Sequence, residues 1–181
     1  MQYLTKEQII IAAEKIFHSF TIECNAVDEK FFFIRPKDKW SVAENVQHLI
    51  ISTNTSTLAY TLPGFMVRWI GGKPNRDSKS YEALVDKYKN KLAEGGRAAG
   101  RFVPKRIDIK YGKERLLQNW NKAASKFIGA IKNKTSESKL DSYLVNHPLL
   151  GKITLRELCY FTIYHTEHHL NIINKITKEA T

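Results

Sequence analysis

Residues 42–62 constrain the fold more than any other part of the chain, because Glu44 is the only charged residue among them. This stretch follows Ser41, which forms with Glu44 the capping box that begins a helix. Pro63 and Gly64 stop the helix at its other end. A helix that faces water normally carries charges on its exposed side. We therefore predict that this helix is surrounded by protein on most sides.

Three further segments have the apolar spacing of amphipathic helices. The first begins at Thr5, which forms a capping box with Gln8, and its apolar residues follow at intervals of three and four. The other two cover about residues 113–130 and 154–175, and the last of them also begins at a capping box. Strand signals are short and isolated, so no sheet is predicted. Four long helices of this kind predict an all-α four-helix bundle.

The connection between the second and third of these helices, about residues 63–115, is unusually long. A short helix is predicted within it from Ser80 to Leu92. Connections of this length usually carry a function or a structure of their own. This one is also basic, because residues 67–115 hold 14 basic and 6 acidic side chains and thus +8 of the net charge of +11. The predicted fold is therefore a bundle with a long basic crossover insert between its second and third helices.

Composition narrows the class of protein. A chain of 181 residues, 43% of them apolar, can form one domain with a full core, so residues 1–181 are expected to be a single domain. No apolar run reaches the length of about 18 residues that a membrane span needs, and the N-terminus lacks the apolar core of a signal peptide. A cytoplasmic protein without a membrane partner is expected. Cys24 and Cys159 have neither metal-binding nor disulfide spacing and are expected to be buried.

Three of the six histidines lie close together on the last predicted helix. His165 and His169 are four residues apart, so they project from the same side about one turn apart, a spacing that lets two imidazoles bind one metal ion. Their side continues an apolar stripe that includes Leu158 and Ile172 and points toward the bundle interior. A buried polar group without a partner costs about 1–3 kcal/mol. The histidine pair therefore needs a common partner.

The nearly uncharged helix supplies a matching polar stripe, with Asn45, His48 and Ser52 at intervals of three and four. His48 is the predicted third ligand of a three-histidine site with open positions, as catalytic zinc sites have. A single histidine is more often a hydrogen-bonded or surface residue, so the metal interpretation depends on finding two polar stripes on separate core helices. His168, three residues from His165, is interpreted as a supporting partner or a pocket residue rather than as a ligand.

Three motifs occur in order along the chain: WSVAENVQHL at residues 40–49, His147-Pro148, and HTEHH at residues 165–169. Together they resemble the DinB/YfiT-like metalloenzyme superfamily, and the resemblance covers about residues 5–176. It implies a four-helix bundle with a divalent metal, usually zinc or nickel, and relatives that often form homodimers. The ligands that it implies are His48, His165 and His169.

A divalent ion held by three neutral imidazoles keeps its positive charge and lowers the pKa of a bound water or thiol. The enzyme is then a hydrolase or, as the bacillithiol and mycothiol transferases of the family suggest, a low-molecular-weight thiol S-transferase with a small-molecule substrate. Glu44 is a candidate general base, although its capping box already explains it, and Asn45 is a candidate for orienting a ligand or substrate. His147 is expected to hold the loop that enters the last helix or to contact the pocket, and Ser52 to line it.

The charges of the insert have two interpretations. They form either a solvated face or a pocket rim that attracts the carboxylate or phosphate of a thiol cofactor, in which case the candidate residues are Arg97, Arg101, Lys105 and Arg106. In both interpretations the prediction of a metal site rests on the helical core and not on the insert.

Two alternatives to an enzyme stay open. One is a non-catalytic metal-binding stress-response protein. The other is a nucleic-acid binder, because aromatic residues are interleaved with the basic residues of the insert at Tyr81, Tyr88, Phe102 and Tyr111. No helix-turn-helix, zinc-finger or RNA-recognition motif supports this last alternative.

Overall fold

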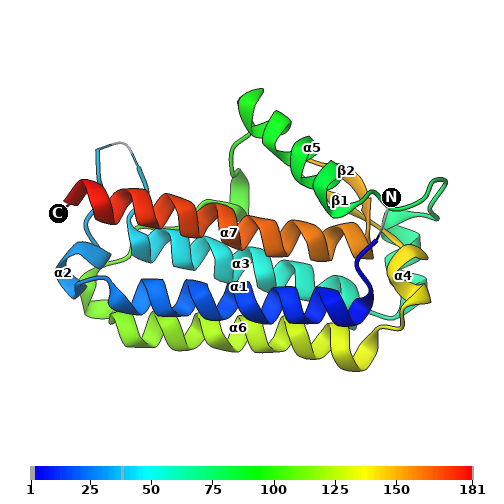
Figure 1. Ribbon diagram of the computed structural model, residues 1–181, viewed down its shortest axis with the longest axis horizontal. Helices are drawn as coiled ribbons and strands as arrows, with labels where there is room; N and C mark the ends of the chain where they lie inside the picture. Colours follow the sequence, from blue (N-terminus) through cyan, green and yellow to red (C-terminus); the bar gives the residue numbers. More distant parts are fainter. Residues whose placement is uncertain (1–2, 38, 181) are drawn as a thin grey trace.

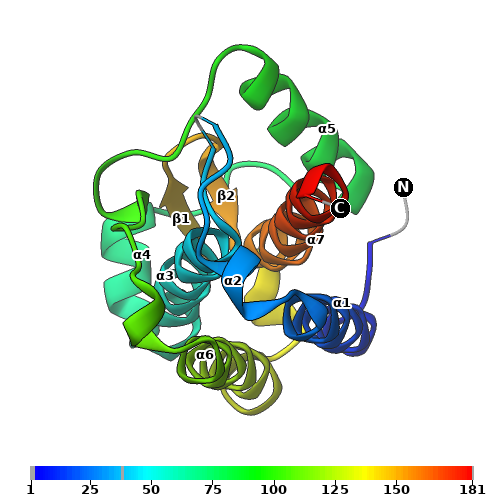
Figure 2. The same cartoon turned by 90° about the vertical axis from the view of Figure 1, so that its left-hand side faces the viewer.

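The computed structural model describes residues 3–37 and 39–180, and most of them are helical (Figure 1). Its long helices are α1 (Lys6–Ala26), α3 (Val42–Thr61), α6 (Lys113–Lys134) and α7 (Leu155–Ala180). α1 and α3 each pack against both α6 and α7, so α1 and α3 occupy opposite corners of the bundle (Figure 2). The predicted all-α four-helix bundle is confirmed.

The direction of the helices explains the long crossover. α3 and α6 run the same way along the bundle, whereas α1 and α7 run the opposite way (Figure 1). The chain that leaves the end of α3 must therefore return along the whole bundle before α6 begins. Antiparallel neighbours need only a short loop, but a parallel pair needs a crossover.

Capping boxes begin the helices where the sequence predicts them. Before α3, the Glu44 carboxylate accepts the Ser41 N–H at 2.8 Å, and the Ser41 hydroxyl accepts the Glu44 N–H. Before α7, Glu157 and Thr154 make the same reciprocal pair at 2.8 and 3.1 Å, and a third pair begins α1 at Thr5. These local bonds satisfy N–H groups that have no partner within the helix, which fixes the first residue of each helix.

The crossover has structure of its own. Its elements are α4 (Gly64–Gly71), α5 (Tyr81–Ala93), η1 (Gly100–Phe102) and η2 (Ile109–Tyr111). α5 occupies the predicted position, and Ser80 caps it. α4 was not predicted, because Pro63 ends α3 and at the same time caps the new helix. The remaining short helices are α2 (Glu29–Phe32) and η3 (Ser138–Asp141).

The prediction of no sheet is wrong for a small region before α7. There β1 (Leu144–His147) and β2 (Gly151–Thr154) form an antiparallel hairpin in the register Leu144↔Thr154 to His147↔Gly151. Each strand has four residues, which is too short for a periodic signal. The imidazole of His147 holds the turn, because its Nδ1 accepts the N–H groups of Leu149 and Leu150 at 3.2 and 3.1 Å.

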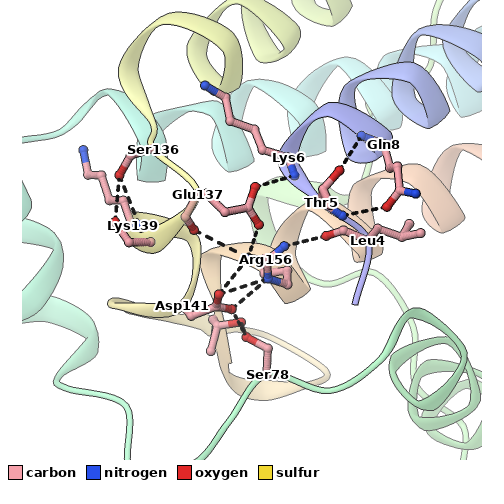
Figure 3. Close-up of polar contacts among 12 residues, drawn as sticks. Leu4, Thr5, Lys6, Gln8, Ser78, Ser136, Glu137, Lys139, Asp141 and Arg156 are labelled. Carbon is pink, nitrogen blue, oxygen red and sulfur yellow. Dashed lines mark hydrogen bonds and ion pairs between the residues drawn. The ribbon is translucent and has the colours of Figure 1, made fainter. Parts of the chain in front are cut away.

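A buried arginine at the start of α7 joins the segment before α1 to the segment after α6 (Figure 3). The side chain of Arg156, at the start of α7, is only 5% exposed and lies within 2.7 Å of carboxylate oxygens of both Glu137 and Asp141. It also donates to the Leu4 carbonyl.

Cys24 and Cys159 are buried in the core, as predicted. Among the helices of the described residues, none combines the length and apolar character of a membrane span.

Candidate metal centre

Three imidazoles from two core helices meet in the groove between α3 and α7. The Nε2 atom of His165 lies 3.1 Å from Nε2 of His48 and 3.2 Å from Nε2 of His169. His48 comes from α3, and the other two project from successive turns of α7. Within the described residues this is the group of His, Cys, Asp and Glu side chains whose geometry could hold a metal ion. The structure thus brings together all three predicted ligands.

The outer nitrogen of each ring is fixed by another group. The N–H at Nδ1 of His48 donates to the backbone carbonyl of Phe102 at 2.6 Å, since a carbonyl can only accept. His169 Nδ1 lies 2.7 Å from Oδ1 of Asn45. The amide nitrogen of Asn45 donates to the Ser41 carbonyl at 2.8 Å, so the side-chain oxygen faces the ring and accepts its N–H. His48 and His169 therefore carry their protons on Nδ1 and present a lone pair at Nε2.

With these tautomers, the cluster has fewer N–H donors than nitrogen lone pairs that need a partner. Two lone pairs, from His48 and His169, face Nε2 of His165, which holds at most one proton. At least one buried lone pair thus has no donor. A divalent cation accepts all three lone pairs, and nitrogens bound to one tetrahedral ion at about 2.0–2.1 Å lie about 3.3 Å apart. The spacing and the donor atoms both fit such an ion.

Burial keeps the three imidazoles in the neutral form that binds metals. Loss of hydration lowers the pKa of His48, and the hydrogen bond to Phe102 opposes this only in part. Burial, and then the neighbouring histidines, lower the pKa values of His165 and His169 well below the ordinary value. Each imidazole is therefore neutral at neutral pH, so one of its two ring nitrogens has a lone pair available to a metal.

Aromatic rings wall the cluster. The indole of Trp40 stacks on the imidazole of His169 with an interplanar angle of 8° and lies 5.1 Å from the ring of His48. Phe161, one turn before His165, stacks on that imidazole with centroids 4.7 Å apart. These rings restrict the rotation of the imidazoles and exclude water from one side of each.

A pocket of about 870 Å³ opens onto the three histidines. α3 and α7 form its floor, and residues 96–102 of the crossover together with α5 and the β1–β2 turn form its walls. The volume lies in the range of small-molecule sites, about 300–1,000 Å³. Among the described residues, none of those lining the pocket is Asp or Glu.

The other predicted polar residues fall into two groups. Ser52 Oγ lies 3.3 Å from Nδ1 of His165, and His147 and His168 line the same pocket. Glu44, in contrast, is occupied elsewhere: Arg35 binds both of its carboxylate oxygens, and Ser41 donates to one of them. Burial raises the pKa of Glu44, but the hydrogen bonds from Arg35 and Ser41 outweigh it, so the net pKa is lowered. These contacts show that Glu44 serves as a helix cap and as the ion-pair partner of Arg35.

Only two of the four residues predicted for the basic rim line the pocket. Arg97 and Arg101 line the pocket, whereas Lys105 and Arg106 are exposed and are not among its lining residues. Part of the remaining charge attaches the crossover to the bundle, as in the ion pair of Arg76 with Glu157 at 2.7 Å. The basic residues of the insert therefore do not form one continuous surface.

Two of the four aromatic residues interleaved with the basic charge, Tyr81 and Tyr88, pack against α7. Tyr88 is buried against Phe161 and Tyr164 of α7, and Tyr81 packs on Tyr160. Bases stack on exposed rings in single-strand binders. Tyr81 and Tyr88 are therefore packing residues, whereas Phe102 and Tyr111 are half-buried.

Sequence reasoning missed two kinds of contact. The Phe102 carbonyl gives no sequence signal, because every residue has a carbonyl. Phe161 and Trp40 had signals that were not used: Phe161 precedes His165 by four residues on the same helical face, and Trp40 stands directly before a capping box.

A family model described as the DinB superfamily matches residues 22–173, which is most of the chain and includes the three histidines. No curated protein and no solved structure matches the chain.

Proposed function

The chain belongs to the DinB superfamily, and on this premise we propose that it is a divalent-metal-dependent enzyme whose ion is held by His48, His165 and His169. Zinc or nickel is the expected ion. The observation that carries the proposal is the convergence of three Nε2 atoms whose lone pairs outnumber the available protons. Neutral imidazole nitrogen is a preferred donor for both metals.

When bound, a divalent ion would supply a Lewis acid that lowers the pKa of a water or thiol beside it. The chain's own residues orient the donors. Phe102 and Asn45 hold the protons of His48 and His169 at Nδ1, which keeps both Nε2 atoms free. Trp40 limits the access of water to the rings.

We favour low-molecular-weight thiol S-transfer over hydrolysis. An ordinary thiol has a pKa of about 8.5 and needs little help to become a thiolate at neutral pH, whereas water has a pKa of about 15.7 and usually needs a base as well. No carboxylate among the described residues lines the pocket, and Glu44 is held by Arg35 and Ser41. In this reaction the thiol sulfur bonds to an electrophilic carbon, the leaving group departs with its electron pair, and the thiol proton is released.

The pocket rim suits an anionic thiol cofactor of the bacillithiol type. Arg97, Arg101 and Lys175 all line the pocket, and they attract carboxylate or phosphate groups. Cytoplasmic location and a homodimer remain predictions from the sequence and the family.

Metal analysis tests the site directly. Protein purified without chelator should contain close to one equivalent of divalent metal per chain, and His48→Ala and His169→Ala should lose most of it. His18→Ala is the matched control, because His18 is exposed on α1. Wild-type protein without metal, or equal metal content in all variants, would contradict the proposed site.

Thiol-transfer assays test the reaction. A panel of low-molecular-weight thiols with a chloro-dinitrobenzene electrophile should give turnover that needs both the metal and the histidines. Full metal content with no transfer, but with ester or amide hydrolysis, would move the assignment to a hydrolase. Full metal content without turnover in either assay would support the non-catalytic metal-binding alternative.

A further inference from the structure

The pocket extends beyond the histidines toward α4, and its lining changes there. Past Ser52 on α3, the walls are formed mainly by apolar side chains, which we call the apolar arm: Ala59, Leu62, Val67, Ile70, Val145 and Leu158. At 1.5 Å per helical residue, the part of α3 from Ser52 to Thr61 is about 14 Å long. The arm is thus long enough for an extended chemical group.

Three polar side chains line the arm, Thr55, Ser56 and Asn146, and the protein engages two of them. The hydroxyl of Thr55 donates to the Ile51 carbonyl at 2.8 Å in its own helix. The amide nitrogen of Asn146 is directed at the Ile70 carbonyl at 3.4 Å. The arm therefore offers mainly apolar contact surface and few hydrogen-bonding groups, so it favours apolar groups over polar ones.

The arm reaches the surface beside α4. Ile70 lines the pocket and is also 53% exposed, so the lining is continuous with the outside of α4. Phe65 and Trp69 on the same helix are 75% and 87% exposed. The helix lies beside the β1–β2 hairpin at one end of the bundle (Figure 1). No acidic residue occurs between Asn45 and Arg76.

The side of the pocket opposite the arm is basic. Lys175 follows His168 by two helical turns on α7, in the direction away from Leu158, and lines the pocket. Arg101 also lines the pocket, next to the residue whose carbonyl binds His48. The three histidines thus lie between an apolar arm and a basic end.

We propose that the reacting bond of the substrate lies at the histidines, with an extended alkyl or aryl group in the apolar arm and an anionic group at Arg101 and Lys175. This inference rests on the proposed function and specifies its substrates. In S-transfer the apolar group belongs to the electrophile and the anion to the thiol. In hydrolysis one molecule carries both groups.

Binding of two homologous series tests the two ends separately. Straight-chain alkanols and alkanoates of four to twelve carbons are titrated calorimetrically into the full chain, as purified and after chelation. Affinity in both series should rise about fourfold per methylene, from about 0.8 kcal/mol per buried CH₂, until the arm is full. Each alkanoate should bind about two- to fivefold tighter than its alkanol, as expected for a solvent-accessible ion pair, and Arg101→Gln or Lys175→Gln should reduce this difference.

A blocked arm supplies the matched comparison. Ala59→Trp places a bulky ring in the arm and should weaken decanol binding at least tenfold while leaving butanol nearly unchanged. Leu58→Trp is the control, because Leu58 is the neighbouring residue on α3 but is 55% exposed and outside the pocket lining.

Affinity that does not depend on chain length in the wild-type protein overturns the inference without any variant. Equal losses in Ala59→Trp and Leu58→Trp, or equal binding of alkanols and alkanoates, also overturn it. Metal content is measured in the same samples. Chain-length dependence without bound metal refutes the proposed function and not the arm, whereas bound metal without chain-length dependence refutes only the arm.

Discussion

Asn45→Ala tests whether the residues around the histidines set the metal affinity. Asn45 Oδ1 accepts the Nδ1–H of His169 at 2.7 Å, and both residues are buried. Its loss leaves a buried N–H without a partner, at a cost of about 1–3 kcal/mol. Loss of such a supporting bond typically weakens metal binding about 10- to 100-fold, which corresponds to about 1.4–2.7 kcal/mol. The two estimates agree, so a loss of this size is expected.

The amide nitrogen of Asn45 complicates this substitution, because it donates to the Ser41 carbonyl at the start of α3. Asn45→Asp separates the two roles. It keeps an oxygen that accepts the His169 N–H but loses the donor to Ser41. We expect it to bind metal at least as tightly as the wild type, while the free energy of unfolding of the metal-free protein falls by about 1 kcal/mol, as for a lost hydrogen bond.

Competition against a fluorescent zinc chelator measures the affinity of each variant. Asn54→Ala is the control, because Asn54 is exposed on the same helix. The reasoning is refuted if Asn45→Ala binds zinc within twofold of the wild type while His169→Ala has lost binding. It is also refuted if Asn45→Asp is as weak as Asn45→Ala.

Two further predictions concern stability and are measured by urea unfolding. A Cβ at Gly71 would lie 1.6 Å from the carbonyl oxygen of Leu144, so Gly71→Ala should lower the free energy of unfolding by about 2–4 kcal/mol. At Gly129 in α6 a Cβ would meet nothing within 4 Å, so Gly129→Ala should raise the free energy of unfolding by about 0.5–1 kcal/mol. Changes of equal sign in the two variants would contradict this reasoning. Burial raises the pKa values of Glu157 and Asp141, but hydrogen bonds, chiefly from arginine, outweigh it, so both are lowered in the folded state. Their stabilisation is then complete above the unfolded pKa values of about 4 and is lost as the pH falls through the folded values, so unfolding free energy that stays constant from neutral pH down to about pH 3 would contradict the assignment.

The helices of the bundle could be predicted because their signals are local. The capping boxes at Ser41 and Thr154 involve residues three positions apart, and the same bonds occur in the structure. The hairpin that begins at Leu144 had no such signal. Gly71 must approach the Leu144 carbonyl closely for α4 to pack on β1, and that requirement depends on a partner more than 70 residues away.

The meeting of the three histidines could also be predicted, because helical spacing places His165 and His169 on one buried face and His48 on another. The orientation of the three imidazole rings could not be predicted from the sequence. It depends on which atom each outer nitrogen meets, and for His48 this is a backbone oxygen 54 residues away in the chain.

That backbone contact changes the interpretation of the crossover. The sequence placed the metal ligands in the helical core and gave the basic insert at most a role at the pocket rim, whereas the structure brings the insert into contact with the histidines themselves. The Phe102 carbonyl in the crossover fixes the tautomer of His48, and Tyr88 packs near the ring of His165 with centroids 6.1 Å apart. Because α3 and α6 run in the same direction, the chain must return along the bundle, and on its way Arg97, Arg101 and Phe102 come to line the pocket above the histidines. The length of the crossover follows from the topology of the bundle, and its path makes it a wall of the metal site.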